Sequence, residues 1–152
     1  MNERPSSLER LLSVHRRVAL DSNVLIYLVE GHNPHAESAR RLINELEAAE
    51  VEIVFATIGL TEVLAGPARS GVVIVFERLV GELRSFGLRL IPLNADIAED
   101  AAWLRGRARL DLIDAIHVAS ARAAGATLFV TNDRGISSTA QLEVVYLDDL
   151  VA

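Results

Sequence analysis

Short runs of apolar residues alternate along the chain with longer segments in which apolar residues recur every three or four positions. The short runs lie at 17–21, 52–57, 88–93, 127–131 and 143–146. Their length and their valine, isoleucine and phenylalanine content predict β-strands. Because strands that alternate with helices form parallel sheets, the pattern predicts an α/β fold with a mostly parallel sheet.

The longer segments have the periodicity of amphipathic helices. We expect helices at 23–30, 35–49, 71–86, about 94–108 and 111–124, and a short capped helix near the amino end that begins at Ser6 or Ser7. Gly31 and Gly125 each follow one of these helices, as is typical of a carboxyl-terminal cap. Residues 61–64 predict only a single helical turn, because Gly66 and Pro67 follow directly.

Composition narrows the class of protein. A chain of 152 residues with 51% hydrophobic and 24% charged residues is typical of one folded domain. It has no cysteine, which excludes disulfides and thiolate metal sites, and no apolar run long enough to span a membrane. We therefore expect a cytoplasmic protein. The net charge of −6 argues against a protein that holds nucleic acid by bulk attraction alone.

Four acidic residues follow the predicted strands or begin a predicted helix. Asp21 ends the first strand, Glu62 follows the second by a few residues, and Asp133 follows the fourth. Asp114 lies in the first turn of the helix at 111–124. Ligands of open α/β sheets bind beyond the carboxyl ends of the strands, so we expect these four acids to share one edge of the sheet.

Four carboxylates in one place repel each other unless they bind cations or protons. A set of oxygen ligands selects hard ions, so the expected cofactor is Mg²⁺ or Mn²⁺. Such an ion, held by a few carboxylates, serves phosphate chemistry by polarising a phosphoryl oxygen and activating water.

Each acid also has a purely structural explanation. Asp21 could cap a helix, Asp114 could complement a helix dipole, Glu62 could be a solvated surface acid, and Asp133 could be a turn residue. The shared topological position of all four favours a site. Its expected supporting residues are Asn23, Thr131 and Asp111.

The histidines, aromatic residues and arginines of the chain give weaker indications of a catalytic role than the four acids do. We interpret His117 as a packed, hydrogen-bonded residue of an apolar helix, and Trp103 and Tyr27 as packing residues. The other three histidines lie in polar stretches and are expected at the surface. Arg105, Arg107 and Arg109 stand just before Asp111 and are candidate contacts to a phosphate backbone, or else the solvated end of a helix.

The four acids stand in ordered motifs that resemble those of the PIN-domain family, and most closely the VapC-type toxins of bacterial toxin–antitoxin pairs. The matching segments are LDSNVLIY at 20–27, TEVLAG at 61–66, DAIHVASA at 114–121 and VTND at 130–133. The resemblance implies a three-layer α/β/α sandwich over residues 17–152, preceded by an extension at 1–16. Asp111 and this extension depart from the family pattern.

The resemblance also implies an activity. It predicts a Mg²⁺- or Mn²⁺-dependent endoribonuclease in which Asp21, Glu62, Asp114 and Asp133 hold the metal and activate water, supported by Asn23. It predicts an RNA substrate, a small antitoxin protein that blocks the site, and a homodimer.

Two alternatives remain open from the sequence. A Mg²⁺-dependent phosphohydrolase on another α/β scaffold usually needs a lysine, and the chain has none. A catalytically silent PIN-like module that binds RNA or protein would keep the fold without a divalent-ion site. The sequence leaves undetermined the RNA that is cut and whether one or two metal ions bind.

Overall fold

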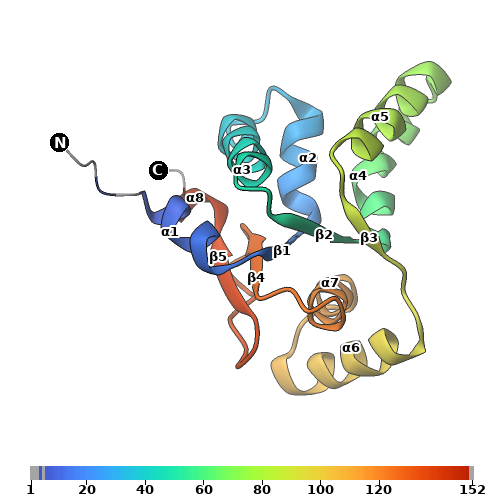
Figure 1. Ribbon diagram of the computed structural model, residues 1–152. Helices are drawn as coiled ribbons and strands as arrows, with labels where there is room; N and C mark the ends of the chain where they lie inside the picture. The colour runs from blue at the N-terminus through green and yellow to red at the C-terminus, as the bar shows by residue number, and fades with distance from the viewer. Residues whose placement is uncertain (1–3, 5, 151–152) are drawn as a thin grey trace.

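The computed structural model describes residues 4 and 6–150 and contains a five-stranded sheet (Figure 1). All of its strand pairs are parallel, and the strand order is β3-β2-β1-β4-β5. The strands are β1 (Arg17–Leu20), β2 (Glu52–Ala56), β3 (Arg89–Ile91), β4 (Leu128–Thr131) and β5 (Glu143–Tyr146). Each lies within one of the predicted runs, so the predicted sheet is confirmed, and it is wholly rather than mostly parallel.

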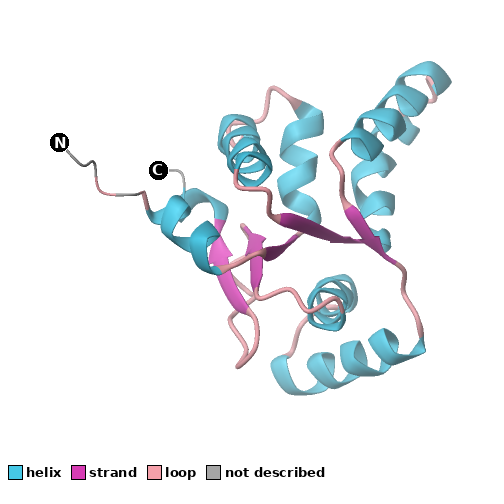
Figure 2. Ribbon diagram, viewed as in Figure 1, coloured by secondary structure: helices cyan, strands magenta, loops and turns pink. Residues whose placement is uncertain are grey.

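Helices connect the strands and flank the sheet (Figure 2). They are α1 (Ser7–Val14), α2 (Ser22–Glu30), α3 (Ala36–Ala48), α4 (Thr57–Arg69), α5 (Val73–Ser85), α6 (Ala95–Ala108), α7 (Leu112–Ala123) and α8 (Leu147–Leu150). The side chain of Ser6 caps α1 as predicted, and the side chain of Asn94 caps α6. Gly31 ends α2 with φ 63°, a conformation that favours glycine.

Alternate residues of the strands build two hydrophobic cores, one on each face of the sheet. Val18 and Leu20 of β1 pack with α2, α3 and α4, whereas Ala19, between them, packs with α6 and α7. This alternation is the two-residue period of a strand buried on both faces. The two cores make the three layers of the predicted α/β/α sandwich, with α2 and α3 on one face and α6 and α7 on the other (Figure 1).

The helix after β2 is longer than the sequence predicts. We expect one turn at 61–64 that ends at Gly66 and Pro67, and this prediction is wrong, because α4 continues through both residues to Arg69. Pro67 removes only one hydrogen bond there, in the last turn of the helix. The buried residues Gly59 and Val63 fix α4 against the core, so tertiary packing outweighs the local signal. The four-residue helix α8 is also absent from the prediction.

The amino-terminal extension packs against the body of the molecule. Leu8 and Leu12 of α1 are buried in the core shared with α2 and α3. Arg16 donates to the backbone carbonyls of Ala49 and Glu50, just before β2. His15, expected at the surface, is largely buried and contacts Thr127 and Glu143. The division of the chain at residue 16 remains a prediction.

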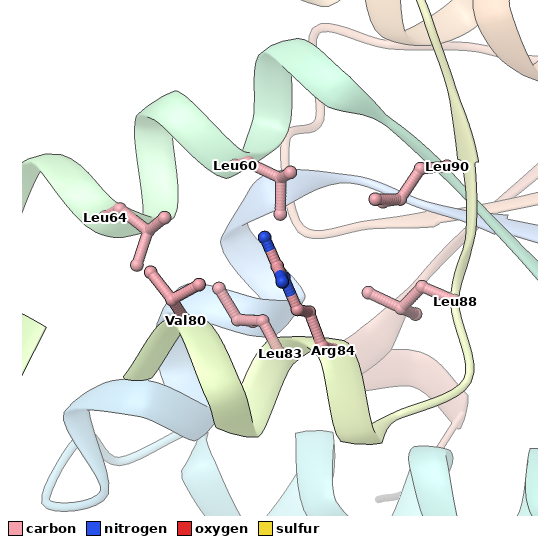
Figure 3. Close-up of a pocket in the computed structure, with 7 residues that line it drawn as sticks. All are labelled: Leu60, Leu64, Val80, Leu83, Arg84, Leu88 and Leu90. Atoms are coloured by element: carbon pink, nitrogen blue, oxygen red, sulfur yellow. The ribbon is translucent and has the colours of Figure 1, made fainter. Parts of the chain in front are cut away.

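An apolar pocket of about 340 Å³ lies between α4, α5 and β3. Figure 3 shows its lining residues, with Arg84 extended into it, and they are Leu60, Leu64, Val80, Leu83, Arg84, Leu88 and Leu90. None of the candidate acids lines this pocket. Within the described residues, no helix combines the length and apolar character needed to cross a membrane.

Candidate active site

Asp21 lies at the carboxyl end of β1, the central strand, and is only 3% exposed. Its Oδ1 accepts a hydrogen bond from the backbone N–H of Ser22 at 2.8 Å, so Asp21 does cap α2. Its Oδ2 accepts a second from the Thr131 hydroxyl at 2.8 Å. Burial raises the pKa of Asp21, and the nearby His117 side chain and these hydrogen bonds oppose the increase. The Asp21 carboxylate therefore both caps α2 and belongs to the candidate site.

Thr131, at the end of β4, joins three of the predicted residues. Its fully buried hydroxyl donates to Asp21 and accepts from the backbone N–H of Asp133 at 2.9 Å. The side-chain amide of Asn23 donates to the same hydroxyl at 3.2 Å and to Asp21 Oδ2 at 3.4 Å. Two of the three predicted supporting residues, Asn23 and Thr131, thus orient Asp21, and Thr131 also holds the loop that carries Asp133. That loop is also a turn, because Asp133 Oδ1 accepts from the backbone N–H of Gly135 at 2.8 Å.

Asp114 faces other acids. Burial raises the pKa of Asp114 to about 7, together with the charges of Asp21 and Asp111 and the proximity of Asp133. Asp111 lies outside the helix as its cap, and its Oδ1 accepts from the backbone N–H of Asp114 at 2.9 Å. Asp111 therefore adds negative charge near Asp114, while one of its oxygens is already bound to the helix terminus.

Glu62 reaches the cluster from α4. Its side chain is 32% exposed, and its Oε1 lies 2.7 Å from Nε2 of His117 on α7. The same nitrogen lies 3.8 Å from Asp21 Oδ1. His117 is 2% exposed, which confirms that it is packed and hydrogen-bonded. Its hydrogen-bond partner, Glu62, is an acid of the candidate site, however, and the sequence did not predict that His117 contacts the site.

A signal for this role of His117 was present in the sequence. It is the one ionisable residue in the stretch 115–121, whose other members are alanine, isoleucine, valine and serine. A buried titratable group requires a polar partner. The sequence could not name that partner, because Glu62 lies 55 positions away.

The donor set fits a hard divalent cation by its chemistry. All four predicted ligands offer carboxylate oxygens, and the pKa of Asp114 is raised because its side chain is partly buried and lies near other acids. In the described part of the chain, however, no three His, Asp or Glu side chains stand as a ready-made metal site. The carboxylates are gathered at one edge of the sheet, and binding an ion requires their side chains to adjust.

Arg105, Arg107 and Arg109 are exposed at the end of α6, which leads directly into the Asp111 cap. No ion pair to these three is found among the described residues. Trp103, interpreted from the sequence as a packing residue, is 64% exposed, and that interpretation is wrong. The guanidinium of Arg107 lies over its ring, 5.7 Å from the centroid.

Comparison with known proteins identifies the family. The family model of the PIN domain matches residues 18–142, which include all four candidate acids. No curated protein sequence matches the chain significantly. The match begins after α1, so this helix lies outside the region that the family model describes.

Solved structures with the same fold come from bacterial toxin–antitoxin systems. A toxin–antitoxin complex from Klebsiella pneumoniae is 25% identical, with a TM-score of 0.68, and the match covers 86% of this chain and 97% of that one. A VapBC2 complex from Rickettsia felis, bound to a promoter DNA fragment, is 22% identical, with a TM-score of 0.66 over 86% and 98% of the two chains.

A third similar structure is that of a VapC toxin from Mycobacterium tuberculosis described as cleaving the sarcin–ricin loop. It is 19% identical, with a TM-score of 0.59, and the match covers 74% of this chain and 86% of that one. At this identity the likeness shows the shared fold. The match of the family model over most of the chain establishes that the chain belongs to the PIN-domain family.

Proposed function

We propose that this PIN-domain protein is a Mg²⁺- or Mn²⁺-dependent endoribonuclease that hydrolyses RNA phosphodiester bonds as the toxin of a toxin–antitoxin pair. PIN-domain proteins of the VapC type are nucleases. The observation that carries the proposal is the surroundings of Asp114, whose pKa is raised to about 7 by burial and three neighbouring acids. Such a cluster is stabilised most effectively by a bound cation.

The ion would be held by four carboxylates, those of Asp21, Glu62, Asp114 and Asp133. The surroundings of these carboxylates differ. The backbone of Ser22 and the hydroxyl of Thr131 fix the buried Asp21 carboxylate. Asp114 would hold the ion as a carboxylate and would release its proton to solvent on binding, because a carboxylate binds a metal only when ionised. When bound, the ion supplies a Lewis acid and an activated water for attack on the phosphorus.

The RNA path proposed here runs over the end of α6. Arg105, Arg107 and Arg109 are exposed there, and the next element is the Asp111 cap of the helix that carries Asp114. Arginine binds phosphate oxygens with charge-assisted hydrogen bonds. These contacts would position the RNA backbone without reading its sequence.

This chain has a groove that suits the proposed antitoxin partner. A cavity of about 470 Å³ lies between α2, α4 and α5, and its lining includes Ile26, Val63, Val75 and Glu62. A partner segment in this largely apolar groove would reach the acid cluster at Glu62. The similar structures from Klebsiella pneumoniae and Rickettsia felis are toxin–antitoxin complexes, which supports such a partner.

We also propose a homodimer that acts in the cytoplasm. The start of α5 exposes Val72, Val73 and Ile74 in succession, at 50%, 66% and 69%. Contiguous exposed apolar residues of this kind are typical of protein–protein contacts. Sedimentation velocity of the purified chain measures the assembly directly.

The first experiment is Mn²⁺ binding by calorimetry on the wild-type chain and on Asp21→Asn, followed by cleavage of a mixed RNA pool. We expect the wild type to bind Mn²⁺ and cut RNA, and the variant to lose both while keeping its fold. Asparagine preserves the size of the side chain and still accepts from Ser22, so circular dichroism should be unchanged. Full cleavage by Asp21→Asn would contradict the proposal.

A catalytically silent PIN-like module that binds RNA or protein is the second candidate. The absence of a ready-made group of three ligands in the described part of the chain favours it. It predicts no Mn²⁺ binding by the wild-type chain, either alone or with a short RNA present. Binding that appears only with RNA would support the nuclease, because phosphate oxygens would then complete the ligand set.

A further inference from the structure

Among the described residues, His117 is the one basic side chain with an ion-pair contact to the four acids of the site. It is 2% exposed, and its Nε2 lies 2.7 Å from Glu62 Oε1 and 3.8 Å from Asp21 Oδ1. The shorter distance is a hydrogen bond, and the longer one is not. The direct partner of the imidazole is therefore Glu62.

The second ring nitrogen determines where the proton lies. Nδ1 is buried and has no hydrogen-bond partner among the described residues. A neutral imidazole carries its proton on one nitrogen only, and a carboxylate accepts but does not donate. A proton on Nδ1 would be buried without an acceptor, and the Nε2 lone pair would then face the Glu62 carboxylate. The contacts therefore require the Nε2–H tautomer, with Nε2–H donating to Glu62.

This tautomer excludes two other roles for the ring. Its free lone pair is on Nδ1, which is buried on the far side of the ring from Glu62, so it is not directed at an ion or water among the acids. Nε2 carries the hydrogen that Glu62 accepts and has no lone pair to offer. His117 is consequently neither a metal ligand nor a general base in this arrangement, and its remaining role is to hold Glu62.

The ring is itself held by packing. The Phe55 ring, fully buried at the end of β2, lies against the imidazole with centroids 5.9 Å apart and planes tilted by 44°. Phe55 in turn fills the space over Gly59 of α4, where an added Cβ would lie 2.2 Å from the phenyl ring. The imidazole is thus fixed before any ion binds, whereas Glu62 is a flexible side chain that is 32% exposed.

We propose that His117 is a positioning residue that holds the Glu62 carboxylate at the site through its Nε2–H, and that it affects metal binding only through Glu62. This inference rests on the proposed function, because it requires that Glu62 be a ligand. Residues that orient a metal ligand by hydrogen bonding typically contribute about 10- to 100-fold to metal affinity. We expect a contribution of that size here.

The test is a set of four variants measured by Mn²⁺ calorimetry: His117→Leu, His117→Gln, Glu62→Gln, and the double variant Glu62→Gln/His117→Leu. Leucine fills the space but donates no hydrogen bond, so Mn²⁺ affinity should fall about 10- to 100-fold. Glutamine places an amide donor near the position of Nε2 and should recover a large part of the loss. In the Glu62→Gln background, His117→Leu should cost nothing further.

A second readout needs no metal. Nitrogen chemical shifts of the imidazole in the metal-free protein at pH 8 should show the proton on Nε2 and none on Nδ1. Thermal unfolding of the metal-free variants separates a folding defect from a positioning defect. If His117→Leu does not fold, the comparison passes to His117→Gln. In the Glu62→Gln background, His117→Gln should cost no further Mn²⁺ affinity.

Three results would overturn the inference: unchanged Mn²⁺ affinity in a folded His117→Leu, additive losses in the double variant, or a proton on Nδ1. If the wild-type chain binds no Mn²⁺ with or without RNA, the proposed function fails and this inference fails with it. If the wild type binds Mn²⁺ and His117→Leu binds it equally well, only the inference fails.

Discussion

Asp21 and Asp114 differ in what surrounds their carboxylates. Asp21 is buried more deeply, yet a backbone N–H and the Thr131 hydroxyl bind its two oxygens. Asp114 is less buried, and its closest charges are those of other acids. Hydrogen bonds to a carboxylate favour its ionised form, and like charges disfavour it. A bound cation would therefore offset the burial and the like charges that disfavour the ionised form of Asp114.

This difference predicts how the stability of the metal-free protein depends on pH. The pKa of Asp114 rises from 3.8 to about 7 on folding. Between these values the folded state binds more protons than the unfolded state, so the free energy of unfolding falls as pH rises, and it levels off above about 7. Relative to Asp114→Asn, which has no group to titrate, the wild type should lose stability across this interval.

Urea unfolding in the presence of a chelator, at pH 4, 5.5, 7 and 8, checks this prediction on both proteins. Asp21 is present in both, so the part of the pH dependence that comes from its own raised pKa largely cancels in the comparison. Parallel stability profiles for the wild type and Asp114→Asn would show that Asp114 titrates in the folded protein as it does in the unfolded chain.

At the scale of elements, α4 connects the hydrophobic core to the site. It carries Glu62, and Gly59 accommodates the Phe55 ring that packs against His117. The sequence predicted only one turn here, because Gly66 and Pro67 are strong local signals for a helix end. Those signals were outweighed by burial of Gly59 and Val63, which depends on residues distant in sequence.

The two glycines of α4 should respond in opposite ways to alanine. In Gly59→Ala, the new Cβ would lie 2.2 Å from the Phe55 ring, so we expect a loss of about 1–3 kcal/mol from overpacking. In Gly66→Ala, nothing lies within 4 Å of the new Cβ, so the higher helix propensity of alanine should add up to about 1 kcal/mol. Urea denaturation of both variants measures the difference.

Gly66→Ala is the control for Gly59→Ala, because both variants make the same chemical change in the same helix. Gly59→Ala should also weaken Mn²⁺ binding, since a displaced Phe55 ring no longer supports His117. Equal stability of the two variants would mean that Phe55 moves aside without cost, and that the packing against His117 does not constrain the site.

At the scale of the whole molecule, the sequence predicted what depends on local pattern. Strand and helix periodicity gave the layers, and the ends of β1 and β4 placed Asp21 and Asp133 at one edge. Contacts that join distant segments were not predictable in this way. His117 meets Glu62 across 55 positions, and whether Trp103 is buried or exposed depends on which face α6 turns to the core.

The distribution of charge over the molecule leads to a prediction about RNA. The chain carries a net charge of −6, but residues 101–110 contain three arginines and no acid. Replacing these with glutamine in the inactive Asp21→Asn background should weaken RNA binding and make it less sensitive to salt. For three lost phosphate contacts on single-stranded RNA, the slope of log affinity against log salt should fall by about 2.

Fluorescence anisotropy with a short single-stranded RNA at about 50–200 mM salt measures that slope. The matched control replaces three arginines that are exposed on α1 and α3: Arg10, Arg40 and Arg41. Both triple variants change the net charge equally, so a general attraction would lower both slopes by the same amount. If the RNA runs over the end of α6, only the variant that lacks Arg105, Arg107 and Arg109 should show a smaller slope. The reason is that phosphate contacts release counterions only where arginines touch the RNA backbone. If the slopes of both variants fall equally, the end of α6 does not contact the RNA. The acid cluster is then the only RNA contact proposed for this fold.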